Sequence, residues 1–170
     1  MRMPESENGL GIHENEFRRL EDELKKLRAE SNAGAVFLIS RDGQLIAASG
    51  ETAGIDTTAL ASLAAGNVAA TGGIARLLGQ GEFTGLFHEG EKQNIQISPA
   101  GQKLILAVLF DGRTSVGLVR LRVKKASRRL LDIFSEIERI SGGEEKQCEP
   151  DVPSFAWITD EDVDGLFKSL

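Results

Sequence analysis

The 170-residue chain contains no tyrosine, one tryptophan and one cysteine, and it has no long apolar run. The lone Cys148 excludes a disulfide framework and a cysteine-rich metal cluster, which suits a reducing cytoplasm. Its apolar runs fall far short of the roughly 20 residues that span a bilayer. Residues 1–12 are polar, so we expect no signal peptide and no integral membrane association. One cytoplasmic domain with tails is expected.

Signatures of catalysis are missing as well. The chain has neither a Gly-x-x-x-x-Gly-Lys-Ser/Thr phosphate loop nor a Gly-x-Ser-x-Gly nucleophile elbow. His13 and His88 lie far apart in the sequence, and His88 and Glu89 would point to opposite faces of a strand, which argues against an acid–base pair. No His, Cys and carboxylate cluster has metal-ligand spacing. We therefore expect a protein that is not an enzyme and that holds no cofactor and no metal.

The net charge of −6 is concentrated in one segment. Residues 144–170 hold eight acids and two bases, which alone gives −6, so the rest of the chain is neutral. A neutral body lacks the basic footprint of a nucleic-acid-binding protein. Residues 113–129 do hold seven bases and no acid, and we interpret this run as the solvated face of a helix.

Apolar periodicity and turn residues predict the elements. Apolar residues at helical spacing predict a helix over residues 14–31, and Asp42-Gly43 between two apolar runs predicts a hairpin. The result is an α+β fold with a five-stranded, mainly antiparallel sheet, helices on both faces and a short C-terminal helix. Strands are predicted over 36–39, 45–48, 86–90, 94–98 and 103–110, and further helices over 57–78, 114–140 and 159–170. The domain limits are a flexible tail over 1–13, the domain over 14–141, a linker over 142–153 and a C-terminal partner-binding segment over 154–170.

The helix predicted over 57–78 has two unlike faces. We assign one to the core: Leu60, Leu63, Ala64, Asn67, Ala70, Ile74, Leu77 and Leu78. The other carries small residues and one arginine, where a solvent-facing stripe normally holds Glu, Lys and Arg. Each glycine in a helix costs about 1 kcal/mol relative to alanine, so close approach of another chain, or of another part of this domain, should offset the cost. This second face consists of Ser62, Ala65, Gly66, Ala69, Gly72, Gly73 and Arg76.

The helix predicted over 114–140 has a recognisable apolar stripe, with Val119 and Val123 at its edge. Its expected buried residues are Leu118, Leu121, Ala126, Leu130, Ile133, Phe134, Ile137 and Ile140.

The C-terminal segment combines apolar residues with a cluster of acids. The acids fall in the first turn of the predicted helix, where the helix dipole favours negative charge. A helix this short is marginal alone in water, so we expect a partner to order it, unless it packs on its own domain. The residues expected to contact a partner are Phe155, Trp157, Val163, Leu166 and Phe167.

Several stretches resemble the Roadblock / dynein light chain domain. Residues 37–46, Phe-Leu-Ile-Ser-Arg-Asp-Gly-Gln-Leu-Ile, are typical of its first hairpin. More specifically, the chain is similar to the MglB family of bacterial motility regulators, over roughly residues 14–170. The matching stretches are 55–63, 65–70, 87–90, 110–122 and 158–167.

This resemblance implies a homodimer whose sheets join edge to edge and whose second helices pair. Two protomers would bind one small Ras-like GTPase of the MglA type and stimulate its GTP hydrolysis. They would do so by repositioning the GTPase's own catalytic residues rather than by donating an arginine finger. The C-terminal segment would reach a second surface of the GTPase and influence nucleotide exchange. The implied process is bacterial cell polarity and gliding motility, in the cytoplasm and at a cell pole. A Roadblock scaffold or adaptor without GTPase-activating activity is the alternative.

Overall fold

Residues 14–141 are described in the computed structural model. The first helix has the predicted bounds, and the α+β class is confirmed. In chain order the elements are α1 (Glu14–Ser31), β1 (Ala35–Ser40), β2 (Leu45–Gly50), α2 (Thr57–Leu77), β3 (Leu86–His88), β4 (Asn94–Ala100), β5 (Leu104–Phe110) and α3 (Val116–Ser141).

The five strands form one antiparallel sheet in the order β2-β1-β5-β4-β3. The central strands β1 and β5 pair from Ala35↔Leu109 to Ser40↔Leu104. Both are covered on each face, which explains why their sequences are continuous apolar runs rather than alternating ones. Gly43, in the turn between β1 and β2, has a φ of 91°, the left-handed conformation that favours glycine there.

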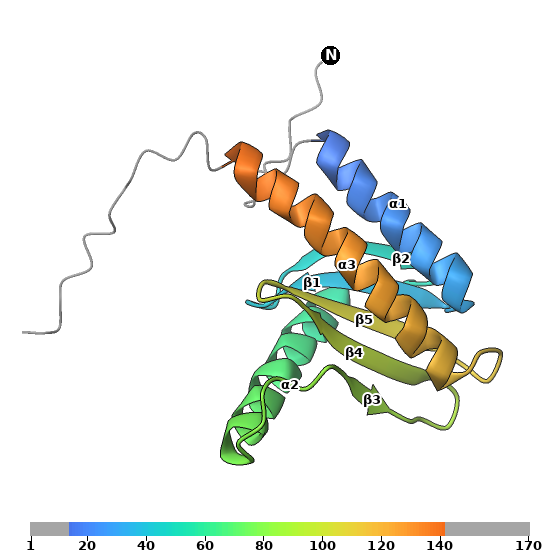
Figure 1. The fold of residues 1–170 in the computed structure, drawn as a ribbon. Coiled ribbons are helices and arrows are strands. Elements are labelled where there is room, and N and C mark those ends of the chain that lie inside the picture. The colour runs from blue at the N-terminus through green and yellow to red at the C-terminus, as the bar shows by residue number, and fades with distance from the viewer. Residues whose placement is uncertain (1–13, 142–170) are drawn as a thin grey trace, which may run out of the picture.

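Helices cover both faces of the sheet, as predicted. Figure 1 shows α1 and α3 side by side on one face and α2 on the other. Consecutive residues of a strand point to opposite faces. Val36 and Leu38 therefore pack in the cluster under α1 and α3, while Phe37 and Ile39 pack in the cluster under α2.

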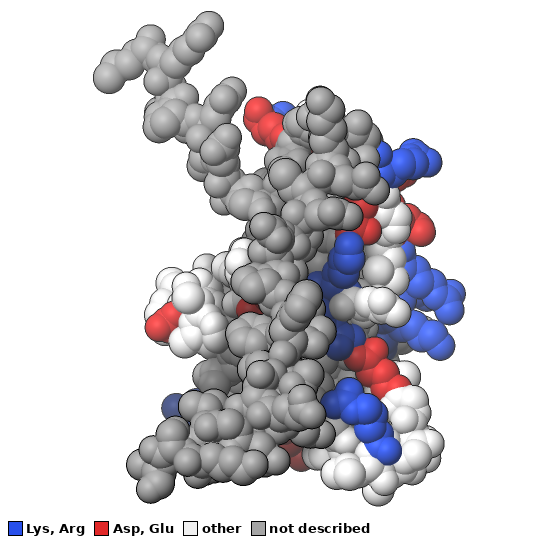
Figure 2. Space-filling view, turned by 90° about the vertical axis from the view of Figure 1, so that its left-hand side faces the viewer, with Lys and Arg blue, Asp and Glu red and all other residues white. Residues whose placement is uncertain are grey.

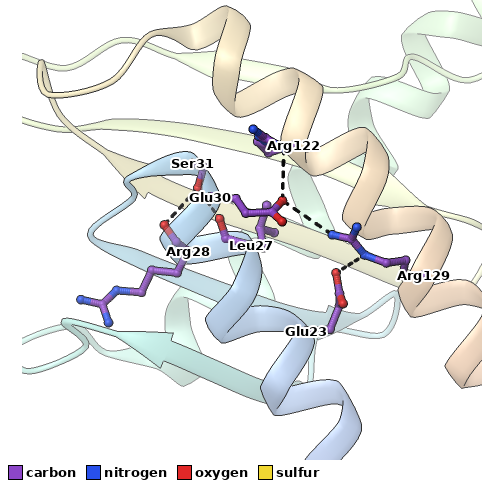
Figure 3. Close-up of polar contacts among 7 residues, drawn as sticks. All are labelled: Glu23, Leu27, Arg28, Glu30, Ser31, Arg122 and Arg129. Atoms are coloured by element: carbon purple, nitrogen blue, oxygen red, sulfur yellow. Dashed lines mark hydrogen bonds and ion pairs between the residues drawn. The ribbon is translucent and has the colours of Figure 1, made fainter.

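The pairing of α1 with α3 includes ion pairs between the two helices (Figure 3). The Arg129 guanidinium lies 2.5 Å from the Glu23 carboxylate and 3.8 Å from that of Glu30. Arg122 lies 3.5 Å from Glu30. These two arginines belong to the basic run that we interpreted as a solvated helix face. That interpretation is wrong for them, because both are half-buried and face α1.

The buried stripe of α3 differs from the predicted one. Val119 and Val123, placed at its edge, are buried, whereas Leu121 is 50% exposed. Relative to the prediction, the helix is rotated about its axis. The residues that face the sheet begin at Val119 and follow one another in steps of three or four. Leu118 and Ile133 are half-buried, and the Ile140 side chain lies outside the described residues. The buried residues are Val119, Val123, Ala126, Leu130, Phe134 and Ile137.

The ends of several other elements also differ from the predicted bounds, and α3 begins at Val116 rather than at residue 114. The strand predicted to reach Gly90 stops at His88, because the Gly90 amide donates to the Asn94 side chain at 3.1 Å and turns the chain toward β4. Before α3, the Arg113 side chain donates to the Asp111 carboxylate at 2.9 Å. This hydrogen bond lowers the pKa of Asp111 below its ordinary value.

Candidate partner-binding site on α2

Local hydrogen bonds fix both ends of α2. The Asp56 side chain accepts a hydrogen bond from the Ala59 amide at 2.9 Å, as an N-cap aspartate does. At the other end Gly79 has a φ of 63° and its amide donates to the Arg76 carbonyl at 3.1 Å. The Gln80 amide donates to the Ala75 carbonyl at 2.9 Å, which completes a Schellman motif. Hydrogen bonds within a single chain therefore fix both ends of α2.

The face of α2 that packs on the sheet is built from small residues. The sheet supplies the bulk of that cluster, including Phe37, Ile39 and Ile105. Because these large side chains already fill the space at close-packed density, the helix contributes mainly alanines. The buried residues of α2 are Ala61, Ala64, Ala65, Val68 and Ala75.

The large apolar residues of α2 face outward. Leu63 is 72% exposed, Ile74 51%, Leu77 88%, and Leu78, just past the helix, 63%. The prediction had placed all four in the core, and for them it was wrong. The larger side chains of α2 face outward because the sheet, not the helix, provides the volume of this cluster. Large exposed apolar patches of this kind mark sites of interaction with a protein, a membrane or a ligand.

The small residues predicted to bind a partner are divided between the two faces. Ala65 is buried against the sheet, so a partner cannot reach its side chain in this chain, and its proposed role is corrected. Gly72 and Gly73 are half-buried. Ser62, Gly66, Ala69 and Arg76 are exposed and remain candidates.

Nothing in the described chain requires glycine at the predicted interface positions. A Cβ added at Gly66 or Gly72 would have no neighbour within 4 Å, and one added at Gly73 would meet only the Arg76 guanidinium at 4.0 Å. Packing inside residues 14–141 therefore does not offset the cost of these helical glycines. An approaching second backbone would use the space that they leave open.

A groove of about 460 Å³ runs beside α2. An ion pair between Arg41 and Glu82 crosses from the first hairpin to the loop after α2 and forms part of its wall. Three predicted partner-binding residues, Ala69, Gly72 and Arg76, line it together. The lining residues are Arg41, Val68, Ala69, Gly72, Arg76, Gln80, Gly81 and Glu82.

One polar contact ties α2 to the edge strand β3. The Asn67 amide nitrogen lies 3.1 Å from His88 Nε2. Asn67 was predicted to be a core residue but is half-buried, and His88 is exposed. Among the described residues, no group of three or more His, Cys, Asp and Glu side chains could hold a metal ion.

By length and composition alone, α2 could also cross a membrane, which the prediction of no membrane helix did not foresee. The cause is that both of its faces are apolar. One face packs on Phe37 and Ile105 of the sheet, so α2 is a part of the domain.

Comparison with known proteins identifies the family. The Roadblock/LC7 domain model matches residues 19–110, and no curated protein sequence matches the chain. The solved structure of MglB from Myxococcus xanthus is 50% identical, covers 71% of this chain and 98% of its own, and has a TM-score of 0.68. The chain belongs to the Roadblock/LC7 family, in its MglB branch.

Two further MglB structures support this placement. The gliding protein MglB of Thermus thermophilus is 31% identical, with a TM-score of 0.68, and covers 74% of this Roadblock chain and 95% of its own. An MglB described as having a tetrameric arrangement is 29% identical, with a TM-score of 0.70 and the same coverage. The predicted resemblance is confirmed.

The second predicted binding segment lies outside the described part of this Roadblock chain. It comprises Phe155, Trp157, Val163, Leu166 and Phe167.

Sequence reasoning missed Leu63, Ile74 and Leu77 as surface residues. The signal that could have found them is the stripe Ala61-Ala64-Ala65-Val68-Ala75, whose helical spacing makes it an alternative core face.

Proposed function

We propose that the chain is a regulator of a small Ras-like GTPase of the MglA type and stimulates GTP hydrolysis by that GTPase. It acts as a homodimer, two protomers to one GTPase, in bacterial cell polarity and gliding motility. It works in the cytoplasm, at a cell pole. Membership of the MglB branch supports the partner and the process.

The exposed apolar face of α2 carries this proposal. Leu63, Ile74 and Leu77 would leave a large apolar area in water if the chain stayed alone. Pairing of two α2 helices covers part of that area, and the open space above Gly66 lets the second backbone come close. The tetrameric arrangement described for one MglB relative is in keeping with association through Roadblock surfaces.

The proposed activation needs no donated arginine. Arg76 is the one arginine of α2, is exposed and lines the groove beside the helix, so it is the candidate for a finger on this helix. Instead, we propose that the paired helices hold the GTPase's own catalytic groups in position, and that Arg76 contributes only to binding. Residues 154–170 add a second contact that influences nucleotide exchange.

The test is phosphate release from the cognate MglA-type GTPase loaded with GTP. Stimulation by the chain at substoichiometric amounts supports a GTPase-activating protein. Binding to the GTPase with no change in phosphate release would instead identify an adaptor. No binding at all would contradict both functions.

A further inference from the structure

Three exposed bases and an exposed leucine form a stripe on the outer surface of α3. Lys124, Lys125 and Arg128 follow Leu121 along the helix, and Leu121 is 50% exposed. Lys124 and Lys125 each lie three or four residues from both Leu121 and Arg128, so the four side chains lie together on one helix face. We call these four residues the α3 basic stripe.

The stripe differs from three other bases of α3, which have partners. Arg122 and Arg129 pair with acids of α1, and Arg120 lies 5.9 Å above the Phe87 ring. Within residues 14–141, none of Lys124, Lys125 and Arg128 has an ion-pair partner. In the view of Figure 2, basic side chains gather along the right-hand side of the molecule.

The stripe carries a cost in the isolated domain. Lys124 and Arg128 are four residues apart, and like charges at that spacing destabilise a helix. The first acid of α3 is Asp132, beyond the stripe. An acidic ligand with apolar side chains would remove the repulsion and cover Leu121.

The chain supplies such a ligand itself. Residues 144–170 hold eight acids and two bases, whereas residues 14–141 hold sixteen acids and seventeen bases. Acidic and apolar residues lie next to each other in this segment. The acids are Asp160, Glu161, Asp162 and Asp164, and the apolar residues are Val163, Leu166 and Phe167. The stripe carries only basic side chains and the charged residues of 160–164 are all acidic, and each has apolar residues beside it, so the two surfaces are complementary.

The connection is long enough for docking within one chain. Arg128 lies thirteen residues before Ser141, which is about 20 Å along a helix. The nineteen residues over 142–160 can span up to about 60 Å when extended. The segment can therefore turn back from the end of α3 and place its acids on the stripe.

We propose that the acidic segment 144–170 docks on the α3 basic stripe of its own chain. Docking keeps the segment's apolar residues out of water on the face of the domain opposite α2. A GTPase that binds this segment would first have to detach it from the stripe. The docking itself needs no GTPase, so its test is separate from that of the proposed function.

The full chain carries native probes for this test, because Trp157 is its one tryptophan and Cys148 its one cysteine. We expect high Trp157 anisotropy and a blue-shifted emission in about 0.01 M salt. Both should be lost in about 1 M salt, as the Debye length falls from about 30 Å to about 3 Å. A spin label on Cys148 should broaden the amide signals of Leu121–Arg128 in low salt only. Salt-independent anisotropy with no such broadening would overturn the proposal.

Charge reversal identifies the surface. Lys124→Glu with Arg128→Glu should lower the low-salt anisotropy of Trp157 to the high-salt value of the original chain. The control, Lys25→Glu with Lys92→Glu, changes net charge equally at exposed positions on α1 and between β3 and β4, and it should leave the anisotropy unchanged. Circular dichroism and thermal unfolding verify that both variants are folded. Equal loss in both variants would mean that only net charge matters and would overturn the proposal.

Two alternatives to docking within one chain, a second copy of the chain and a membrane at the α3 basic stripe, give different results. Docking on a second copy makes the Trp157 signal depend on protein concentration, whereas docking within one chain does not. If the stripe binds a membrane instead, the chain binds phosphatidylserine vesicles through Lys124 and Arg128 while Trp157 stays unaffected by their reversal. Either result would overturn the proposal.

Discussion

Leu63 and Ala64 are consecutive residues of α2, about 100° apart around the helix axis, yet one faces solvent and the other faces the sheet. Ala64 is 2% exposed and packs on the sheet, whereas Leu63 is 72% exposed. The smaller residue is in the core because the strands beneath it carry Phe37 and Ile39. The larger residue therefore remains available to another molecule.

We predict that Leu63→Glu with Leu77→Glu converts a dimer into a monomer. Both side chains are strongly exposed, and a carboxylate at the centre of an apolar contact is costly to bury. Light scattering at micromolar concentration should give the monomer mass of 18.3 kDa for the variant and twice that for the original chain. A variant that stays dimeric would place the dimer contact elsewhere, and Lys25→Glu with Lys92→Glu controls for added negative charge.

The second prediction concerns the neighbouring position. Ala64→Leu should lower the free energy of unfolding by about 1–3 kcal/mol, because it overpacks the contact with the sheet. Urea unfolding at a fixed protein concentration measures the change. If the variant is as stable as the original chain, the alanine face is not close-packed and the orientation of α2 is wrong.

A substitution at Gly66 should change the stability of the domain and its binding to a partner in opposite directions. Gly66→Ala should raise the free energy of unfolding by up to about 1 kcal/mol, since alanine favours the helix and the added methyl group meets no atom within 4 Å. The same change should weaken the pairing of two α2 helices, and with it GTPase binding, if the second α2 backbone approaches there.

The matched control for this position is Gly117→Ala in α3, where the added Cβ also meets open space. It should leave GTPase affinity unchanged. A Gly66→Ala variant that binds the GTPase as tightly as the control would show that no backbone comes near this position.

Much of the fold could be predicted from the sequence, because it rests on local signals. Helical spacing located α1 to the residue, and the apolar runs located β1 and β5. The faces of α2 could not be assigned in the same way. Both are apolar, and the choice between them depends on side-chain volume in strands that are distant in sequence. The same applies to Leu121 and Val123, whose assignment depends on a small rotation of α3 against the sheet.

For Arg76 we predict that replacement by alanine reduces stimulated GTP hydrolysis by less than tenfold at saturating protein. An arginine donated to the transition state contributes about 10³ to 10⁵ in rate, so its loss is easily distinguished from a weaker binding contact. Single-turnover hydrolysis over a range of chain concentrations separates the two. A loss near a thousandfold at saturation would show that Arg76 acts as an arginine finger.

The most direct test of the central claim, that the outward face of α2 activates a GTPase, is phosphate release from the GTP-loaded MglA-type partner. The original chain and the Lys25→Glu/Lys92→Glu control should stimulate release to the same extent. Leu63→Glu with Ile74→Glu, which changes two exposed residues of that face and leaves the sheet-facing alanines intact, should abolish stimulation while the domain stays folded. Full stimulation by the folded Leu63→Glu/Ile74→Glu variant would contradict the account.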